Sequence, residues 1–424
     1  VVFPDPIWIV YKFPAYLHLF SIVRISLSIL SKKEKRKLSN MASSPSVLLS
    51  SPPPTAKDGS RFIDSNYLQK QSHVPANFKW PEEDAASAQE ELNAPVVDLE
   101  GFFNCDVVAT ENAAKLIRSS CLRHGFFQVT NHRVDADLIQ LAYDHVDDFF
   151  NLPIEEKIKV QRRPGSPYGY SGAHMDRFSS NLPWKETFSF AFQDGPEKTV
   201  ADYFKFTISK DFEQTGLVYQ KYSEAMHSLS LSIMELLAIG LGVDRMLYRE
   251  FFEDAVSIMR TNLYPTCQEP NLSLGTGPHC DPNALTILHQ DLVGGLDVFV
   301  DNKWHKVRPV LGALVINIGD VFAALSNGIY RSCLHRAAVN SHKERRSLVF
   351  FMCPRADKVV KPAEELVRKG EGGTRKFPDF TWSDLLEFTQ NHYRVNETTL
   401  ENFTDWFLSA DRSNFKPTHF KPTH

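Results

Sequence analysis

The chain has 424 residues, of which 42% are hydrophobic and 23% are charged, and its formal net charge is −4. This length allows one large domain or two to three ordinary ones, and the composition excludes disordered, collagen-like and polytopic membrane proteins. The small negative charge argues against a nucleic-acid partner.

The first forty residues differ in composition from the rest of the chain. They carry seven basic and two acidic residues, whereas the remainder carries 40 basic and 49 acidic residues. Ile7–Ile29 is about long enough for a transmembrane helix, but Lys12 and Arg24 interrupt it, and a central charge costs about 3 kcal/mol on insertion. Because the first methionine is Met41, we interpret 1–40 as translated upstream sequence rather than as a membrane anchor.

Strands and helices are predicted in alternation up to about residue 250. The predicted strands are Ala94–Leu99 and Phe126–Thr130, and the predicted helices are Thr110–His124, Leu138–Phe149 and Gly216–Gly242. Thr110 is the expected N-cap of the first of these helices, and Gly125 is its expected stop. The few breakers inside the last helix predict that it is long and buried.

Short apolar runs separated by turn signals follow from about residue 250. The predicted strands are Ala255–Tyr264, Leu285–His289, Leu296–Val300, Ala313–Ile318, Leu334–Val339 and Leu348–Cys353. Gly275–Pro278 and Gly294–Gly295 are among the expected turns. Strands at this spacing predict a barrel or a double-sheet jelly roll. The pattern then returns to helix over Trp382–Tyr393 and Asn396–Phe407.

A candidate metal site begins at His279-Cys280-Asp281. If this segment is extended, residues i and i+2 face the same side, so the imidazole and the carboxylate point together. H-x-D alone is a weak signal, but His335 follows 54 residues after Asp281, at the start of another predicted strand. Two histidines and one carboxylate on one face form a facial triad with open metal positions, a ligand set that suits Fe(II) and oxygen chemistry.

Ten residues after His335, Arg345 and Ser347 form an R-x-S pair that leads into an apolar strand. A 2-oxo acid can chelate iron through its keto and carboxylate oxygens and leave one position for dioxygen. Its distal carboxylate then needs a partner inside the barrel, and arginine supplies the planar fork that lysine lacks. The two motifs together predict an iron site that also accepts a 2-oxo acid.

These motifs resemble those of plant 2-oxoglutarate- and Fe(II)-dependent dioxygenases and, within them, of gibberellin 20-oxidases. The resemblance covers roughly residues 60–408. Its main segments are 120–132, 182–187, 262–270, 275–291, 294–304, 317–328 and 332–340. The iron and R-x-S motifs specify only the superfamily, whereas the segment L-P-W-K-E-T is associated with the gibberellin substrate. That segment comprises Leu182, Pro183, Trp184, Lys185, Glu186 and Thr187.

The resemblance implies a role for each matching residue. It makes His279, Asp281 and His335 the Fe(II) ligands and catalytic centre, and Leu182–Thr187 the substrate segment. The 2-oxoglutarate carboxylate would be held by Arg345, Ser347, Tyr264 and Asn262. The implied activity is successive oxidation and loss of carbon 20 of C20 gibberellins, which yields C19 gibberellins. The implied co-substrates are 2-oxoglutarate and dioxygen, with ascorbate as the reductant.

The resemblance also implies an architecture and a setting. The expected fold is α+β with a mainly β core, a double-stranded β-helix (jelly roll) flanked by N- and C-terminal helices. The expected parts are upstream sequence (1–40), a flexible N-terminal segment (41–93), a helical dioxygenase region (94–250), the Fe(II)/2-oxoglutarate jelly-roll domain (251–355), and C-terminal helices with a tail (356–424). We expect a cytoplasmic monomer that binds a small diterpenoid acid and has no nucleic-acid or membrane partner. The six cysteines contain no C-x-x-C pair, so we expect free thiols.

Two positions depart from the family pattern. The usual N-Y-Y-P-P-C is N-L-Y-P-T-C here and keeps Tyr264, while Arg133 stands where a glycine is usual. If that position needs a positive φ, we expect local strain of about 1–3 kcal/mol. Other histidines, such as His174 and His289, are interpreted as surface or core residues rather than ligands.

Three alternatives remain at this point. A zinc hydrolase could use the same three ligands, but it would need neither Arg345 nor Ser347 and would need a general base. A silent binding module is compatible with the fold, but it has no use for an open redox site. Another plant dioxygenase, such as a gibberellin 3- or 2-oxidase or a flavonoid oxygenase, would not generally carry L-P-W-K-E-T.

Overall fold

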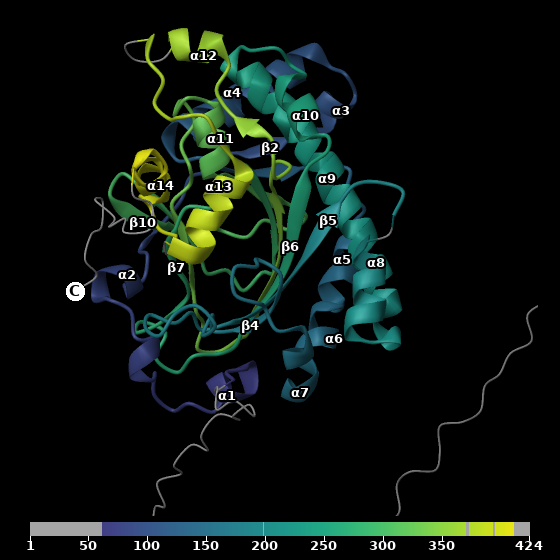
Figure 1. Cartoon of the computed structure of the whole chain (residues 1–424), viewed down its shortest axis with the longest axis vertical. Coiled ribbons are helices and arrows are strands. Elements are labelled where there is room, and N and C mark those ends of the chain that lie inside the picture. The colour runs from purple at the N-terminus through teal and green to yellow at the C-terminus, as the bar shows by residue number, and fades with distance from the viewer. Residues whose placement is uncertain (1–61, 198, 370–372, 393–394, 411–424) are drawn as a thin grey trace, which may run out of the picture. The chain divides into compact units, whose positions relative to one another are not determined.

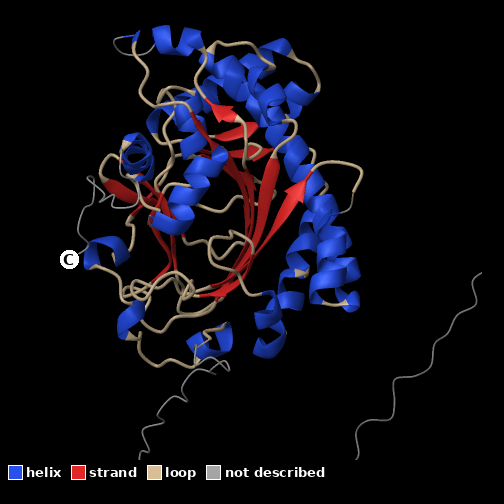
Figure 2. Cartoon of the chain, in the orientation of Figure 1, coloured by secondary structure: helices blue, strands red, loops and turns tan. Residues whose placement is uncertain are grey.

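The computed structural model describes residues 62–197, 199–369, 373–392 and 395–410. The expectations for 1–40 and for the first part of 41–93 lie outside the described residues. The described chain has an α+β fold in which strands form the centre and helices surround them (Figures 1 and 2). Helices and strands alternate early in the chain, and strands dominate after residue 255.

Most of the helices are short. They are α1 (Ser65–Gln69), α2 (Glu82–Ala85), α3 (Glu100–Phe103), α4 (Val107–Arg123), α5 (Ala136–Asp144), α6 (Val146–Phe150), α7 (Ile154–Lys157), α8 (Thr199–Tyr203), α9 (Glu213–Leu241), α10 (Leu247–Phe252), α11 (Asp320–Leu325), α12 (Glu364–Lys369), α13 (Trp382–Glu387) and α14 (Thr399–Leu408). Single π-helical turns follow α8 at Phe204–Ile208 and α13 at Phe388–His392.

The strands form two large sheets and one small one. They are β1 (Glu90–Glu91), β2 (Val96–Asp98), β3 (Phe126–Thr130), β4 (Gly169–Gly172), β5 (Glu186–Gln193), β6 (Val256–Tyr264), β7 (Leu274–His279), β8 (Leu285–Gln290), β9 (Leu296–Val300), β10 (Lys303–Lys306), β11 (Leu314–Ile318), β12 (His335–Ala338), β13 (Arg345–Met352), β14 (Val359–Val360) and β15 (Phe380–Thr381). The strand orders are β1-β10-β9-β12-β7, β2-β3-β11-β8-β13-β6-β5-β4 and β14-β15.

The long helix α9 covers the outer face of the eight-stranded sheet, where it packs against β8 and β13. It lies beside α5 and α8 in Figure 1. Within the described residues, Lys210–Leu241 is long and apolar enough to cross a membrane, but 72% of its apolar window is buried inside the protein. The prediction of a long buried helix is therefore confirmed.

The helix predicted over Thr110–His124 begins earlier than expected. It is α4, whose N-cap is Asp106, with a side chain that accepts a hydrogen bond from the amide of Ala109. Thr110 lies inside the helix and is buried, so its assignment as the N-cap was wrong. Gly125 does end the helix, because its φ of +68° is the left-handed conformation that glycine adopts without strain.

Two other local predictions were also wrong. The helix predicted over Leu138–Phe149 is divided into α5 and α6 at His145, the residue that ends one helix and begins the next. Gly275–Pro278 is not a turn but the middle of β7, which pairs with β12. Gly277 is needed there because a Cβ would lie 2.0 Å from the ring of Trp80.

The strained position predicted at Arg133 is present. Arg133 has a φ of +59°, a left-handed conformation that a side chain disfavours. Its guanidinium donates to the side-chain oxygen of Asn104 and lies 4.9 Å from the ring centroid of Phe103. These contacts hold the turn after β3.

β5 was not predicted, although its sequence carries the signal. Phe188, Phe190 and Phe192 alternate with smaller residues, the period-2 pattern of a strand, and all three are buried. Phe188 stacks on Phe149 of α6 with ring centroids 4.1 Å apart. β5 places the substrate segment, which immediately precedes and begins it, beside β6.

The cysteines are free, as expected. Cys105 is exposed, and the buried thiols are Cys121, Cys267, Cys280, Cys333 and Cys353.

Candidate active site

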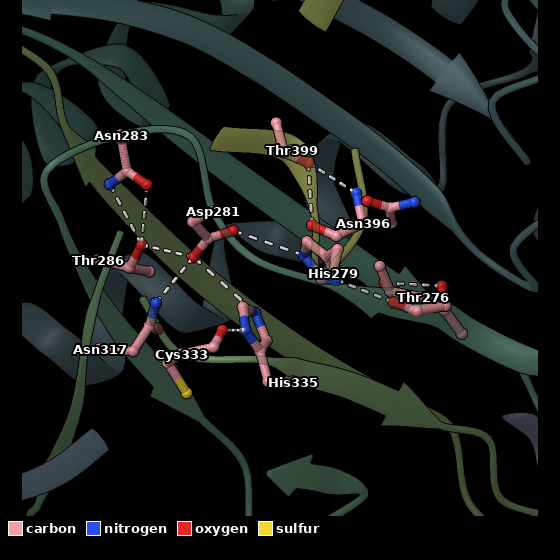
Figure 3. Close-up of polar contacts among 12 residues, drawn as sticks. Thr276, His279, Asp281, Asn283, Thr286, Asn317, Cys333, His335, Asn396 and Thr399 are labelled. Carbon is pink, nitrogen blue, oxygen red and sulfur yellow. Dashed lines mark hydrogen bonds and ion pairs between the residues drawn. The ribbon is translucent and has the colours of Figure 1, made fainter. Parts of the chain in front are cut away.

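The three predicted metal ligands converge at one end of the five-stranded sheet. His279 ends β7, Asp281 follows two residues later in a loop, and His335 begins β12. One ligand atom from each lies within 4.8 Å of the others, and the two imidazoles and the carboxylate point toward a common position in Figure 3. Asp281 Oδ1 lies 3.4 Å from His279 Nε2, and Asp281 Oδ2 lies 3.8 Å from His335 Nε2.

Backbone carbonyls fix the orientation of both imidazoles. His279 Nδ1 donates to the carbonyl oxygen of Gly277 at 2.9 Å, and His335 Nδ1 donates to that of Cys333 at 3.0 Å. With Nδ1 protonated, Nε2 carries the free lone pair that a metal requires. Burial, followed by the neighbouring His279, lowers the pKa of His335 to about 4, so His335 is neutral at physiological pH.

Asp281 is oriented by two uncharged donors. Thr286 Oγ1 donates to Asp281 Oδ2 at 2.7 Å, and Asn317 Nδ2 donates to the same oxygen at 2.9 Å. Burial alone would raise the pKa of Asp281, but the two histidines and Asn317 together hold it well below its usual range. A carboxylate beside two imidazoles whose Nε2 atoms face the same position is the donor set of a 2-His-1-carboxylate iron site, so the residues fit Fe(II).

The predicted carboxylate-binding residues lie on two paired strands of the other large sheet. Arg345 pairs with Tyr264, and Ser347 pairs with Asn262, across β13 and β6. The Arg345 guanidinium lies 4.9 Å from the ring centroid of Tyr264, and one of its terminal nitrogens donates to Gln290 Oε1 at 3.1 Å. Asn262 Nδ2 donates to Ser347 Oγ at 3.1 Å.

This second group retains unused hydrogen-bonding capacity. Among the described residues, the buried Nε of Arg345 and Oδ1 of Asn262 have no hydrogen-bond partner, and no carboxylate pairs with Arg345. A buried guanidinium without a counter-ion is costly unless a ligand supplies the charge. The arrangement therefore fits the distal carboxylate of 2-oxoglutarate.

Both groups open into one cavity of about 870 Å³ between the two large sheets. Each large sheet contributes to its lining, and residues near α13 and α14, such as Trp382 and Asn396, line it as well. The predicted site residues that line it are Asn262, Tyr264, His279, Asp281, His335, Arg345 and Ser347. The fold thus brings all seven together.

The substrate segment divides into two sets of side chains. Pro183 and Lys185 line the cavity, whereas the other four members do not. Lys185 is buried, and its ammonium donates to Thr276 Oγ1 at 2.9 Å and lies 5.7 Å from the ring centroid of Tyr264.

The remaining members face the protein interior. Trp184 is 1% exposed, packs edge-on against Phe78, and donates from Nε1 to the carbonyl of Thr266. Leu182 packs in the same apolar cluster. Thr187 lies within β5 and is buried.

Glu186 is the centre of a buried polar network. It accepts hydrogen bonds from Lys157 at 2.9 Å, from Tyr170 at 2.9 Å and from the amide of Ser65. Its side chain and that of Lys157 are both fully buried. These contacts join α1, α7 and β4 to the start of β5.

Comparison with known proteins decides the family. Residues 255–354 match the 2OG-Fe(II) oxygenase superfamily, and residues 94–207 match the family described as non-haem dioxygenase in morphine synthesis N-terminal. Gibberellin 20 oxidase 3 of Arabidopsis thaliana is 51% identical over 357 residues, which are 82% of this chain and 93% of that protein. The chain belongs to the gibberellin 20-oxidase family. It is a 2-oxoglutarate- and Fe(II)-dependent dioxygenase.

Other comparisons agree with membership of the gibberellin 20-oxidase family. Gibberellin 20 oxidase 2 of Oryza sativa subsp. japonica is 54% identical over 341 residues, covering 80% of this chain and 86% of that protein. Among solved structures, JOX2 in complex with 2OG, Fe and JA aligns with a TM-score of 0.70 at 30% identity, over 81% of this chain and 98% of that one. The rice dioxygenase for auxin oxidation aligns with a TM-score of 0.61 at 25% identity, over 73% and 98% of the two chains.

Arg260 and His174 are among the cavity-lining residues of this gibberellin 20-oxidase family member that were not predicted from the sequence. Arg260 lies two and four residues before Asn262 and Tyr264, so the period of two along β6 places it on the same face. That register was a usable signal. His174, interpreted as a surface or core residue, lines the cavity from the turn after β4; it lies in an irregular segment without a periodic pattern.

Proposed function

We propose that this chain oxidises carbon 20 of C20 gibberellins in successive steps and removes it, giving C19 gibberellins in gibberellin biosynthesis. The observation that carries the proposal is one cavity that holds a 2-His-1-carboxylate triad, an arginine (Arg345) that pairs with no carboxylate of the described residues, and Lys185 of the gibberellin-associated segment. The extent of the similarity to gibberellin 20-oxidases supports the choice of substrate.

The site residues have distinct roles in this proposal. His279, Asp281 and His335 hold Fe(II), which when bound supplies the redox chemistry that couples oxidation of the substrate to conversion of 2-oxoglutarate and dioxygen into succinate and carbon dioxide. Arg345 and Ser347, assisted by Tyr264 and Asn262, bind and orient the distal carboxylate of 2-oxoglutarate. Because these residues lie on the paired strands β6 and β13, they hold the co-substrate in one orientation.

The substrate segment acts in two ways. Lys185 and Pro183 face the gibberellin, whereas Leu182, Trp184, Glu186 and Thr187 hold the segment against the cavity wall. The apolar lining, which includes Phe351 and Trp382, accepts the diterpenoid skeleton and excludes water from the reacting carbon.

We infer that the two large sheets are the halves of a double-stranded β-helix. Of the strands from β6 to β13, four (β6, β8, β11 and β13) lie together in one sheet and four (β7, β9, β10 and β12) in the other. The chain thus passes repeatedly between the sheets, which is the winding of a jelly roll. The alignment with JOX2 supports this inference.

We also infer the setting of the enzyme. Ascorbate serves as the reductant, the protein is a monomer, and it acts in the cytoplasm, which fits the free thiols of the described residues. The family matches at 94–207 and 255–354 support a division into a helical region at 94–250 and a jelly-roll domain at 251–355, followed by C-terminal helices from 356.

The test uses residues 41–424, purified without oxygen and supplied with Fe(II) and 2-oxoglutarate. C20 gibberellins, C19 gibberellins and a flavanone are offered separately, and succinate and oxidised products are measured by mass spectrometry, with His279→Ala as the blank. Stepwise loss of carbon 20 that is absent from the blank is the expected result. Turnover of C19 gibberellins or flavanone alone would contradict the proposal and assign another dioxygenase activity.

A further inference from the structure

One part of the cavity carries several positive charges that the iron and 2-oxoglutarate sites do not use. Arg162, Arg177, Lys185 and Arg260 all line the cavity and lie close enough to His174 to lower its pKa, in addition to the larger effect of burial. Arg162 is neutralised by Asp176, which it contacts at 2.8 and 2.9 Å. The other charges near His174 include two without such a partner.

These two charges are Arg260 and Lys185. Arg260 Nε donates to Ser189 Oγ at 2.8 Å, and its guanidinium lies 5.0 Å from the ring centroid of Phe351. Lys185 donates to the hydroxyl of Thr276. Within the described residues, neither forms an ion pair with a carboxylate, and the direct contacts of both are uncharged. The negative charge of Asp281 acts on both of them without direct contact.

The positive charges destabilise one another. Burial and then the charge of Arg162 lower the pKa of Arg260 to about 10. Burial, followed by the charges of Arg260 and Arg162, holds the pKa of Lys185 well below its ordinary value. The buried Nε2 of His174 has no hydrogen-bond partner among the described residues. An anion at this place would relieve the repulsion and supply acceptors for all three side chains.

We propose that Arg260 and Lys185, with His174 beside them, bind a carboxylate of the gibberellin and so anchor the substrate. The inference rests on the proposed function, because it takes the substrate to be a diterpenoid acid. It adds a substrate-binding arginine that lies outside the gibberellin-associated segment.

At Arg260 this subsite is separate from the one for 2-oxoglutarate, whereas Lys185 lies 5.7 Å from the ring of Tyr264, which belongs to the 2-oxoglutarate site. Arg345 pairs with Tyr264, whereas Arg260 pairs with Val349, four residues further along the same ladder. Four residues of a strand span about 13 Å. The guanidinium of Arg345 contacts Tyr264 and Gln290, and that of Arg260 contacts Ser189 and Phe351, so they share no contact. One cavity therefore offers two carboxylate positions, one for each organic acid of the reaction.

The test combines a change in the protein, at Arg260, with a change in the ligand, at each carboxylate of the gibberellin, and compares the binding affinities. Binding of a C20 gibberellin free acid, and of its monomethyl esters with one ester for each carboxylate, is measured by calorimetry without oxygen. The protein carries Mn(II) and 2-oxoglutarate, so that no turnover occurs. The wild type, Arg260→Gln and Arg260→Lys are compared, and Arg355→Gln is the matched control, since Arg355 lies outside the cavity and pairs with Asp254 and Asp357.

The expected result is that the loss of affinity caused by mutating Arg260 and the loss caused by esterifying one of the carboxylates are not additive. Esterification of that carboxylate weakens binding to the wild type and to Arg355→Gln about 10- to 100-fold. In Arg260→Gln the free acid binds about as weakly as that ester, and in Arg260→Lys it binds with intermediate affinity. The KM for 2-oxoglutarate changes by less than about twofold in all variants, since Arg345 is untouched.

Two results would overturn the inference while leaving the proposed function intact. If Arg260→Gln weakens binding of the free acid and of both esters equally, Arg260 has a structural role. If Arg260→Gln still binds the free acid more tightly than the ester by the same factor as the wild type, the carboxylate binds elsewhere. If Arg260→Gln does not fold, Arg260→Lys provides the same comparison. A wild-type protein that neither binds nor oxidises any C20 gibberellin would instead overturn the proposed function and this inference with it.

Discussion

The hydroxyl of Thr286 orients the Asp281 carboxylate by donating a hydrogen bond to one of its two oxygens. It donates to Asp281 Oδ2 at 2.7 Å and is itself held by Asn283 Nδ2 at 3.2 Å. Thr286→Val keeps the shape but removes this donor. We expect it to weaken binding of Fe(II) or Mn(II) about 10-fold or more, as loss of an outer partner does at other metal sites, measured by anaerobic titration.

Thr261→Val is the matched control for this prediction. Thr261 is a buried threonine on β6 of the same sheet, does not line the cavity, and donates from its hydroxyl to the carbonyl of Phe188 at 3.4 Å. Equal metal affinity in the two variants would show that Asp281 does not depend on Thr286 for its orientation.

Arg345 offers a test of geometry at constant charge. Arg345→Lys keeps the positive charge but loses the planar fork that meets both oxygens of a carboxylate. We expect the KM for 2-oxoglutarate to rise about 10-fold or more, because one of two charge-assisted hydrogen bonds is lost. Steady-state kinetics with a saturating gibberellin measure this value.

Arg346→Lys controls for disturbance of the strand itself. Arg346 is the next residue of β13, but its guanidinium pairs with Asp147 and Glu344 outside the cavity. The control should leave the KM for 2-oxoglutarate unchanged. A similar KM in both variants would remove Arg345 from the co-substrate site.

At the scale of single residues, the site residues that could be predicted from the sequence are those that stand at a regular spacing along the chain. His279 and Asp281 are two residues apart, and so are Arg345 and Ser347, and each spacing has a direct geometric meaning. The same spacing along β6 indicates that Arg260 shares a face with Asn262 and Tyr264. It does not indicate that Arg260 lacks a carboxylate partner among the described residues, which becomes visible only after β5 and β6 are paired.

Between elements, Glu186 ties the start of β5 to α1, α7 and β4. Glu186→Gln leaves the Lys157 ammonium, which is fully buried, without its counter-charge. We expect the free energy of unfolding to fall by about 3–5 kcal/mol, the usual result of breaking a buried pair from one side. The KM for the gibberellin should change much less than the stability, because Glu186 does not line the cavity and acts on the substrate only through the position of the segment.

Urea unfolding and steady-state kinetics measure these two quantities. Glu90→Gln is the control, since the exposed pair that it breaks with Lys303 should cost less than about 1 kcal/mol. Unchanged stability combined with a higher KM would instead mean that Glu186 contacts the substrate.

Elements were predictable where burial of one face or both leaves a regular pattern. β9 was predicted with the bounds observed, and β6, β8 and β11 were predicted to within one residue at either end. α9 was predicted to within a turn, since it is long and buried. Where tertiary contacts override local signals, prediction failed: β7 contains Gly275 and Gly277, which suggest a turn, but both are required by close packing against Tyr264 and Trp80.

For the molecule as a whole, the cavity lies between the two large sheets, and helices such as α9 lie against the outside of the eight-stranded sheet (Figure 2). The sequence could indicate two sheets from the recurrence of short strands. It could not indicate which faces line the cavity, because β6, β8 and β11 are buried on both sides and carry no clean alternation. The division of the substrate segment into cavity-facing and core-facing residues was hidden for the same reason.

Burial of neutral histidines should make the fold sensitive to acid. Burial lowers the pKa of His289 on β8 to about 4, and its ring packs edge-on against Tyr143 of α5. The folded protein therefore keeps this imidazole neutral, whereas the unfolded chain protonates it below about pH 6.5. Its contribution to stability is complete above pH 6.5 and is lost as the pH falls toward 4, by about 2 kcal/mol between pH 7.5 and pH 5.

We expect His289→Gln to reduce the difference in unfolding free energy between these two pH values by that amount, whatever its effect at pH 7.5. Urea unfolding at both pH values measures it, with the surface variant His342→Gln as the control. An identical pH dependence of wild type and His289→Gln would show that the pKa of His289 is the same in the folded and the unfolded protein.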